Sequence, residues 1–223
     1  GATAGVIDGV ADNVVLVSPQ DISEIKSVLK SDNDIAAVIV EPTGSSFGMV
    51  PMTQDFLQSV RKYTEEQGVI FIFDEVVTGF RCSPGGAQQA FDIKPDLTTL
   101  AKILAGGLPG GAVAGRKDIL DDLDFERAAA QGREKIGHPG TFNANPVSAA
   151  AGIAALKIIE QTDACEKANT SAAILRENFN TILDKHNVPW AAYGTFSGVH
   201  LYMNKNGQTI NQSTFNADEI GYA

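Results

Sequence analysis

Short apolar runs of strand length alternate with amphipathic helices in the first half of the chain. This alternation restricts the fold more than any other feature. The runs cover residues 35–40, 68–73 and 97–101. The first two are almost continuously apolar, which is typical of strands buried on both faces of a parallel sheet. The sequence therefore predicts an α/β fold in which helices flank a mostly parallel sheet.

Helices with one apolar face are expected between these strands. In the segment DISEIKSVLK, Asp21 with Glu24 three residues later is close to a capping box, which marks a helix start. The apolar stripe of the next helix comprises Phe56, Leu57, Val60 and Tyr63. Further along, Asn145 and Pro146 are an N-cap and first-turn proline, so a third helix is predicted to reach about residue 159.

Two domains are expected. Residues 1–160 would form part of a large α/β domain and residues 161–223 part of a smaller one. A helix predicted at about 164–186 opens the second part, and VPWAAYG and GVHLYM follow it as two strands. Neither end of the chain carries an evident terminal element, so we expect it to be a piece of a longer protein.

The charge balance excludes several classes of partner. The net charge is −10, and both nucleic acids and anionic membranes favour clusters of Lys and Arg instead. No apolar stretch approaches the ~18 residues of a membrane span. Cys82 and Cys165 are far apart and the histidines are scattered, so no metal site is expected. Two lone cysteines suit a reducing cytoplasm.

Charged residues stand where the predicted strands end. Glu41, Asp74 and Lys102 each lie at or just past the carboxyl end of a strand. Ligands of open α/β sheets bind beyond these ends, so the three residues are predicted to meet at one functional rim. Glu75 follows Asp74 directly and would point to the other face of the sheet.

Three accounts of Asp74 and Lys102 are open on the residues alone. The pair could be a buried ion pair that braces two strand ends. The glycine-rich stretch AGGLPGG could cradle a phosphate, but it matches no nucleotide-binding fingerprint and more simply permits tight turns beside Lys102. Alternatively, Lys102 could be an amine nucleophile for an aldehyde cofactor. A pyridine cofactor would then need Asp74 at its ring nitrogen, with Val76 packed on the ring.

Several motifs together resemble a known family. EPTGSSFGMVP, FDEVVTGFR, GGAQQ, PDLTTLAKILAGGLPGGAVAGR and HPGTFNANPVSAAAG occur in the order seen in class III pyridoxal-phosphate aminotransferases. Within that family the chain is most similar to glutamate-1-semialdehyde 2,1-aminomutases and their aminotransferase relatives. The resemblance implies fold type I, with a large domain built on a mostly parallel sheet and part of a small C-terminal α+β domain.

The resemblance also implies roles for individual residues. Lys102 would bind pyridoxal phosphate as a Schiff base and later carry the proton between substrate and cofactor. Asp74 would pair with the pyridine nitrogen, and Val76 would pack on the ring face. Thr141 would donate to the cofactor phosphate of the neighbouring subunit, which implies a homodimer with shared sites. Without the family, Thr141 would be taken for a turn hydroxyl that caps local backbone.

The substrate stays open between two enzyme classes. The aminomutase reaction would convert glutamate-1-semialdehyde into 5-aminolevulinate for tetrapyrrole synthesis. The segment GTFNANP departs from the aminomutase pattern and favours a transaminase acting on another amine or ω-amino acid and a keto acid. A decarboxylase is disfavoured because Ala101, and not a histidine, precedes Lys102.

One cofactor contact differs from the aminomutases, and part of the pocket is missing. Ser46 stands where they have an asparagine aimed at the cofactor's phenolic oxygen, and a serine would reach that oxygen through water. The resemblance also places half of the cofactor pocket outside this chain, so the isolated chain is expected to be inactive or very weak. The last alternative is an inactive scaffold with a structural Asp–Lys pair.

Overall fold

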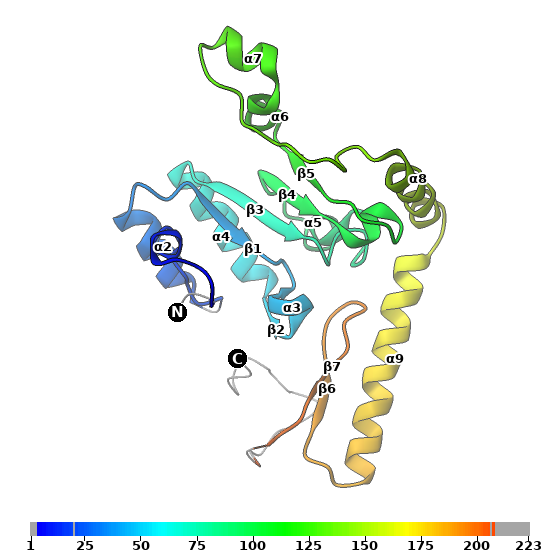
Figure 1. Ribbon diagram of the computed structural model, residues 1–223. Coiled ribbons are helices and arrows are strands. Elements are labelled where there is room, and N and C mark those ends of the chain that lie inside the picture. The colour runs from blue at the N-terminus through cyan, green and yellow to red at the C-terminus, as the bar shows by residue number, and fades with distance from the viewer. Residues whose placement is uncertain (1–3, 20, 206, 208–223) are drawn as a thin grey trace.

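The computed structural model describes residues 4–19, 21–205 and 207 (Figure 1). Its helices are α1 (Asp8–Ala11), α2 (Ile22–Ser31), α3 (Ser45–Gly48), α4 (Gln54–Gln67), α5 (Gly86–Phe91), α6 (Lys117–Leu120), α7 (Phe125–Ala130), α8 (Pro146–Gln161) and α9 (Ala164–Lys185), with 3₁₀ turns η1 (Lys102–Ala105) and η2 (Asp121–Leu123). Its strands are β1 (Ala37–Val40), β2 (Val50–Pro51), β3 (Ile70–Glu75), β4 (Leu97–Leu100), β5 (Ala112–Gly115), β6 (Ala191–Tyr193) and β7 (His200–Tyr202).

The main sheet has the strand order β1-β3-β4-β5. The first three strands are parallel, and β5 returns antiparallel to β4. Strands β6 and β7 form a separate antiparallel pair. The predicted α/β fold with a mostly parallel sheet is therefore confirmed.

Helix starts follow the capping chemistry expected from the sequence. The Asp21 carboxylate accepts a hydrogen bond from the Ser23 N–H at 2.9 Å and opens α2. The Glu24 carboxylate reaches back past the cap to the Ser18 N–H at 2.7 Å, so the capping box is not closed in its usual form. In α8, the Asn145 side chain caps the first turn as predicted.

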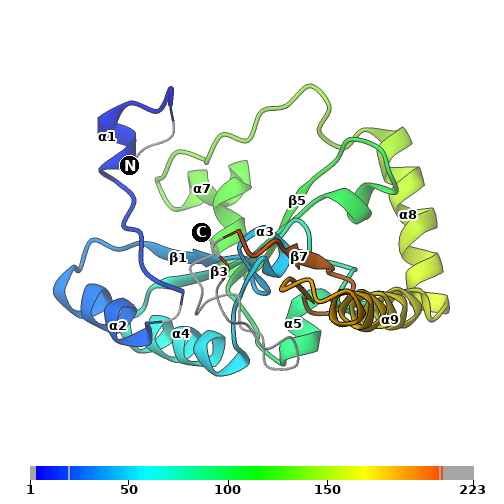
Figure 2. The ribbon, with the colours of Figure 1, turned by 90° about the horizontal axis from the view of Figure 1, so that it is seen from below.

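The hydrophobic core lies between one face of the sheet and two helices. Figure 2 shows α2 and α4 on the same side of the sheet. Phe71 and Phe73 of β3 are fully buried there, with their rings edge to face at 5.0 Å between centroids. The remaining buried members of this core are Ile25, Leu29, Phe56, Leu57, Val60, Val69 and Ile93. The alternation along β3 sends its phenylalanines to this core and Asp74 to the opposite face.

On that opposite face, among the described residues, β1 is more exposed than its continuous apolar run predicts, since Ile39 is 60% exposed. Val113 of β5, a strand outside the predicted buried runs, is 48% exposed on the same face. Among the residues that the structure describes, the helices of the core cover only one face. The face that carries Asp74 therefore offers accessible apolar surface beside a carboxylate.

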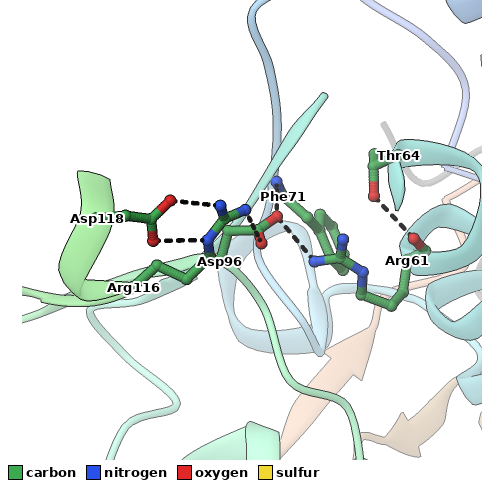
Figure 3. A network of polar contacts seen from close by, with 6 residues as sticks. All are labelled: Arg61, Thr64, Phe71, Asp96, Arg116 and Asp118. Carbon is green, nitrogen blue, oxygen red and sulfur yellow. Dashed lines mark hydrogen bonds and ion pairs between the residues drawn. The ribbon is translucent and has the colours of Figure 1, made fainter. Parts of the chain in front are cut away.

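A polar network fixes the amino end of β4 (Figure 3). Asp96 is 7% exposed and accepts hydrogen bonds from the Phe71 N–H, Arg61 and Arg116 at 2.8, 2.8 and 3.1 Å. Arg116 also binds Asp118. Burial alone would raise the pKa of Asp96, but these donors outweigh it and hold the pKa below its usual value.

Asp96→Asn is expected to flatten the dependence of stability on acid pH. Because the pKa of Asp96 is lower in the folded chain, its stabilising effect is present above the unfolded pKa of about 4. It is lost as the pH falls through the lower folded pKa. Urea unfolding across this acid range measures the difference. Asp34→Asn, an exposed acid outside the network, should keep the wild-type profile, and an unchanged profile for Asp96→Asn would contradict the prediction.

The C-terminal part of the described chain is built on α9. Figure 1 shows this helix running away from the main sheet, with β6 and β7 alongside. The Asn180 side chain binds both backbone groups of Ala192, at 2.8 and 2.9 Å, and so ties β6 to the helix. The predicted division into residues 1–160 and 161–223 stays a prediction. No helix in the described ranges has the length and apolar character needed to cross a membrane.

Candidate functional site

Three predicted residues lie at the carboxyl edge of the main sheet. Glu41 directly follows β1, Asp74 is the last residue but one of β3, and Lys102 lies two residues past β4. Burial raises the pKa of Glu41, and hydrogen bonds from the N–H groups of Phe47 and Ser46 oppose this rise. The Asp74 charge also raises the pKa of Glu41, whereas the Lys102 charge lowers it. The structure thus brings Asp74 and Lys102 each within electrostatic range of Glu41, as their positions at strand ends suggested.

The Asp74 carboxylate is held through one of its two oxygens. The Thr99 hydroxyl donates to Oδ1 at 3.0 Å, and the Val76 N–H donates to the same atom at 3.1 Å. Within the described residues, no hydrogen bond reaches Oδ2. This second oxygen is therefore available to a donor on a ligand.

The alternative of a bracing ion pair is not supported. In the described part of the chain, no ion pair joins Asp74 to Lys102 or Lys102 to any other acid. The Lys102 side chain is exposed. A lysine that braced two strand ends would be paired and buried, so Lys102 is better placed to react than to stabilise the sheet.

Close packing against α8 fixes the backbone beside Lys102. Lys102 has a φ of 48°, a left-handed conformation that costs a non-glycine residue about 1 kcal/mol. A Cβ on Gly106 would lie 2.4 Å from the Ala151 carbonyl oxygen, and one on Gly152 would lie 2.4 Å from the Leu104 carbonyl oxygen. These glycines let η1 and α8 approach closely, in keeping with the structural interpretation of the glycine-rich stretch.

Gly152→Val is expected to destabilise the protein by about 2 kcal/mol, because the added side chain forces η1 away from α8. Urea unfolding followed by circular dichroism measures the change. Ala154→Val, on an exposed position of the same helix, is the control and should cost only a few tenths of a kcal/mol. Equal effects from the two substitutions would contradict the close approach.

The second acid of the FDEV motif has a separate, structural role. Glu75 is 1% exposed and points into the core, opposite to Asp74. Its carboxylate accepts hydrogen bonds from the Ala87 N–H at 2.6 Å, the Gln88 side chain at 2.9 Å and the Thr78 hydroxyl at 3.1 Å. The predicted direction of Glu75 is confirmed. Within the described residues its carboxylate is bound by N–H groups at the start of α5 and forms no ion pair.

Ser46 lies in a loop that Glu41 organises. The Glu41 carboxylate accepts a hydrogen bond from the Phe47 N–H, and both Ser46 and Phe47 have left-handed backbone angles, with φ of 51° and 60°. These contacts favour the structural interpretation of Glu41. The Ser46 side chain is exposed close to the rim, and its contact with a cofactor stays a prediction.

The small β6–β7 sheet touches this same loop. His200 Nε2 lies 3.0 Å from the Phe47 carbonyl oxygen, and the Tyr193 hydroxyl donates to the Met49 carbonyl oxygen at 2.7 Å. The Arg81 guanidinium stands 5.5 Å from the centre of the Phe47 ring. The C-terminal strands therefore help to hold the loop that carries Ser46.

The cofactor contacts of Val76 and Thr141 stay predictions. Strand β3 ends at Glu75, so the argument that Val76 shares a strand face with Asp74 does not apply, although the Val76 N–H does bind Asp74. Thr141 is exposed in the segment before α8. Within the described residues no hydrogen bond joins it to Asp74 or Lys102.

Sequence reasoning missed Thr99 and the full set of partners of Glu75. Thr99 pairs in register with Asp74 on the neighbouring strand. If the register of the two parallel strands had been inferred from their motifs, it would have placed Thr99 beside Asp74. The histidines, cysteines and acids of the described ranges form no group of three or more that could hold a metal ion.

A protein family model and a curated relative both match this chain. Residues 10–217 match the family model described as aminotransferase class III. A glutamate-1-semialdehyde 2,1-aminomutase from Sulfurisphaera tokodaii is 40% identical over 185 residues, which is 83% of this chain and 42% of that protein. This chain therefore spans less than half the length of that curated relative.

Solved structures with the same fold include transaminases. An omega-transaminase from Sphaerobacter thermophilus superimposes with a TM-score of 0.80 at 33% identity, covering 91% of this chain and 45% of that one. A transaminase with PLP bound also gives a TM-score of 0.80, at 29% identity, covering 90% of this chain and 46% of the other.

Proposed function

Because this chain belongs to the class III aminotransferases, we propose that the whole protein transfers amino groups with pyridoxal phosphate and that Lys102 and Asp74 hold the reactive part of the cofactor. The observation that carries the proposal is the rim itself. It presents an exposed lysine amine and a carboxylate at the same sheet edge, and within the described residues the amine has no ion pair and one carboxylate oxygen has no hydrogen bond. Enzymes that use a pyridine aldehyde hold it with a lysine at the aldehyde and a partner at the ring nitrogen.

The residues present fit the cofactor at its aldehyde and its ring. Lys102 would bind the aldehyde carbon, and Asp74 Oδ2 would accept a hydrogen bond from the protonated ring nitrogen. Val76 would pack on the ring, Ser46 would reach the phenolic oxygen, and Thr141 would donate to the phosphate of the neighbouring subunit. The accessible apolar surface beside Asp74 suits a flat heteroaromatic ring.

Pyridoxal phosphate supplies an aldehyde that takes up the substrate amine and a protonated ring that accepts electron density when a carbon–hydrogen bond breaks. The Lys102 amine would bind the aldehyde and, when it is not bound there, would act as a base that takes the proton from the substrate carbon and delivers it to C4′ of the cofactor. Asp74 would keep the ring nitrogen protonated throughout.

For the substrate, we favour the aminomutase reaction from glutamate-1-semialdehyde to 5-aminolevulinate. Its support is the 40% identity to the aminomutase of Sulfurisphaera tokodaii. The second candidate is transfer between another amine or ω-amino acid and a keto acid. It is favoured by the GTFNANP segment and by the likeness to an omega-transaminase.

The same proposal includes a partner and a location. A homodimer would let Thr141 of one subunit serve the rim of the other, and the exposure of Thr141 in this chain is compatible with such a role. We propose the cytoplasm as the location, because the two cysteines are free thiols, which suits a reducing compartment.

Absorption spectroscopy and product analysis test the proposal. The purified chain is titrated with pyridoxal phosphate, and a visible band supports the cofactor site. The whole protein is then given glutamate-1-semialdehyde alone, or an amine with a keto acid. Formation of 5-aminolevulinate from the single substrate supports the aminomutase, while transfer that requires the keto acid supports the transaminase. A whole protein that neither binds the cofactor nor turns over either substrate would overturn the proposal.

A further inference from the structure

We infer that Thr99 is a positioning residue that orients Asp74 toward the cofactor ring nitrogen, an inference that rests on the proposed function. The Thr99 hydroxyl donates a hydrogen bond to Asp74 Oδ1 at 3.0 Å, and no other hydrogen bond of this hydroxyl occurs among the described residues. Thr99 is linked to the proposed ring site through its hydrogen bond to Asp74. Its role is therefore one of orientation and not of direct binding.

The sheet register places Thr99 beside Asp74. Asp74 and Thr99 are aligned partners on the parallel strands β3 and β4, so their side chains stand next to each other on one face. A threonine side chain has few allowed χ1 rotamers, and the strand backbone fixes its starting direction. The hydroxyl is therefore delivered to Oδ1 from a nearly fixed position.

Two donors on one oxygen determine the plane of the carboxylate. The Val76 N–H approaches Oδ1 from the chain that follows Asp74, and Thr99 approaches from the adjacent strand. With only one of these bonds, the carboxylate could turn about its χ2 axis. With both, Oδ2 keeps one direction, which is what a ring nitrogen needs from its partner.

The neighbouring threonine provides an internal comparison. Thr98 faces the core, where its hydroxyl accepts a hydrogen bond from the Gln88 side chain at 3.0 Å. Gln88 also binds Glu75. Thr99 therefore binds Asp74 directly on one face of the sheet, and Thr98 is linked to Glu75 through Gln88 on the other face. Thr98 belongs to the core network, and within the described residues no hydrogen bond joins it to Glu41, Asp74 or Lys102.

The test compares Thr99→Val, which has the same shape without the hydroxyl, with Thr99→Ser, which keeps the hydroxyl. Thr98→Val is the matched control on the other face. Each purified chain is titrated with pyridoxal phosphate and with a carbocyclic analogue in which a C–H group replaces the ring nitrogen. Affinities are read from absorption, and thermal unfolding is recorded for every variant.

Thr99→Val is expected to weaken binding of pyridoxal phosphate by about tenfold, because the hydrogen bond that it removes orients a charged group. Its affinity for the carbocyclic analogue should equal that of the wild type. Thr99→Ser should restore binding of the natural cofactor, and Thr98→Val should leave both affinities unchanged even if it lowers the unfolding temperature.

Two results would overturn the inference while leaving the proposed function intact. One is wild-type affinity of Thr99→Val for pyridoxal phosphate. The other is an equal loss for the cofactor and its analogue, since that would indicate general damage to the pocket. A wild-type chain with no band that depends on Lys102 would overturn the cofactor site in this chain and the role of Thr99 together.

Discussion

Lys102→Ala is expected to abolish the visible absorption band that pyridoxal phosphate gives with this chain. It should also lower amino transfer by the whole protein at least about a thousandfold, since it removes both the nucleophile and the base. The Lys102 amine is exposed, unpaired in the described part of the chain and within electrostatic range of Glu41 at the rim. An alanine there offers no amine to the aldehyde.

The control for this variant is Lys94→Ala. Lys94 is exposed and lies just before β4, at the opposite end of the strand from Lys102. Both substitutions remove one positive charge, so a nonspecific electrostatic effect on a phosphorylated cofactor would appear equally in the two variants. A band of wild-type strength in Lys102→Ala, or equal losses in both variants, would contradict the assignment of Lys102.

Glu75→Ala is expected to have the largest effect on stability, a loss of about 3–5 kcal/mol, because each buried donor left without an acceptor costs about 1–3 kcal/mol. The substitution leaves the Ala87 N–H and the Gln88 side chain without their acceptor in a site where the carboxylate is 1% exposed. It also removes the anion at the start of α5, where the helix dipole favours negative charge. Such a loss is a large fraction of the total stability of a typical domain.

Urea unfolding followed by circular dichroism measures this loss. Glu75→Gln keeps the shape and one acceptor oxygen, so its effect should be smaller than that of alanine. Glu66 is an exposed acid of α4 that pairs with Lys62 at 3.9 Å, so Glu66→Ala should change stability by less than about 1 kcal/mol. If Glu75→Ala were no more destabilising than Glu66→Ala, the burial and bonding of Glu75 would not contribute as described.

The two acids of the FDEV motif illustrate what a sequence pattern can predict. Strand alternation sends Asp74 and Glu75 to opposite faces whatever surrounds them, so their directions could be predicted. Their partners could not. The sequence did not indicate that the N–H groups at the start of α5 would bind the Glu75 carboxylate.

The loop after β1 shows that contacts between distant parts of the chain also could not be predicted. The sequence indicated a connection between a strand and α4, and a separate pair of C-terminal strands. It did not indicate that the two would meet. His200 and Tyr193 bind carbonyl groups of this loop across more than half of the chain. Contacts between residues so distant in sequence leave no periodic signal in either segment.

Local physics determined much of this protein from the sequence alone. The strand and helix periodicities, the Asp21 and Asn145 caps, and the ends of parallel strands placed Glu41, Asp74 and Lys102 at one rim. These features depend on neighbours a few residues away. Only the tertiary structure decided that the Thr99 hydroxyl binds Asp74 and that the start of α5 binds Glu75. Strand register and helix docking create those contacts, and both bring together donors and acceptors that are remote along the chain.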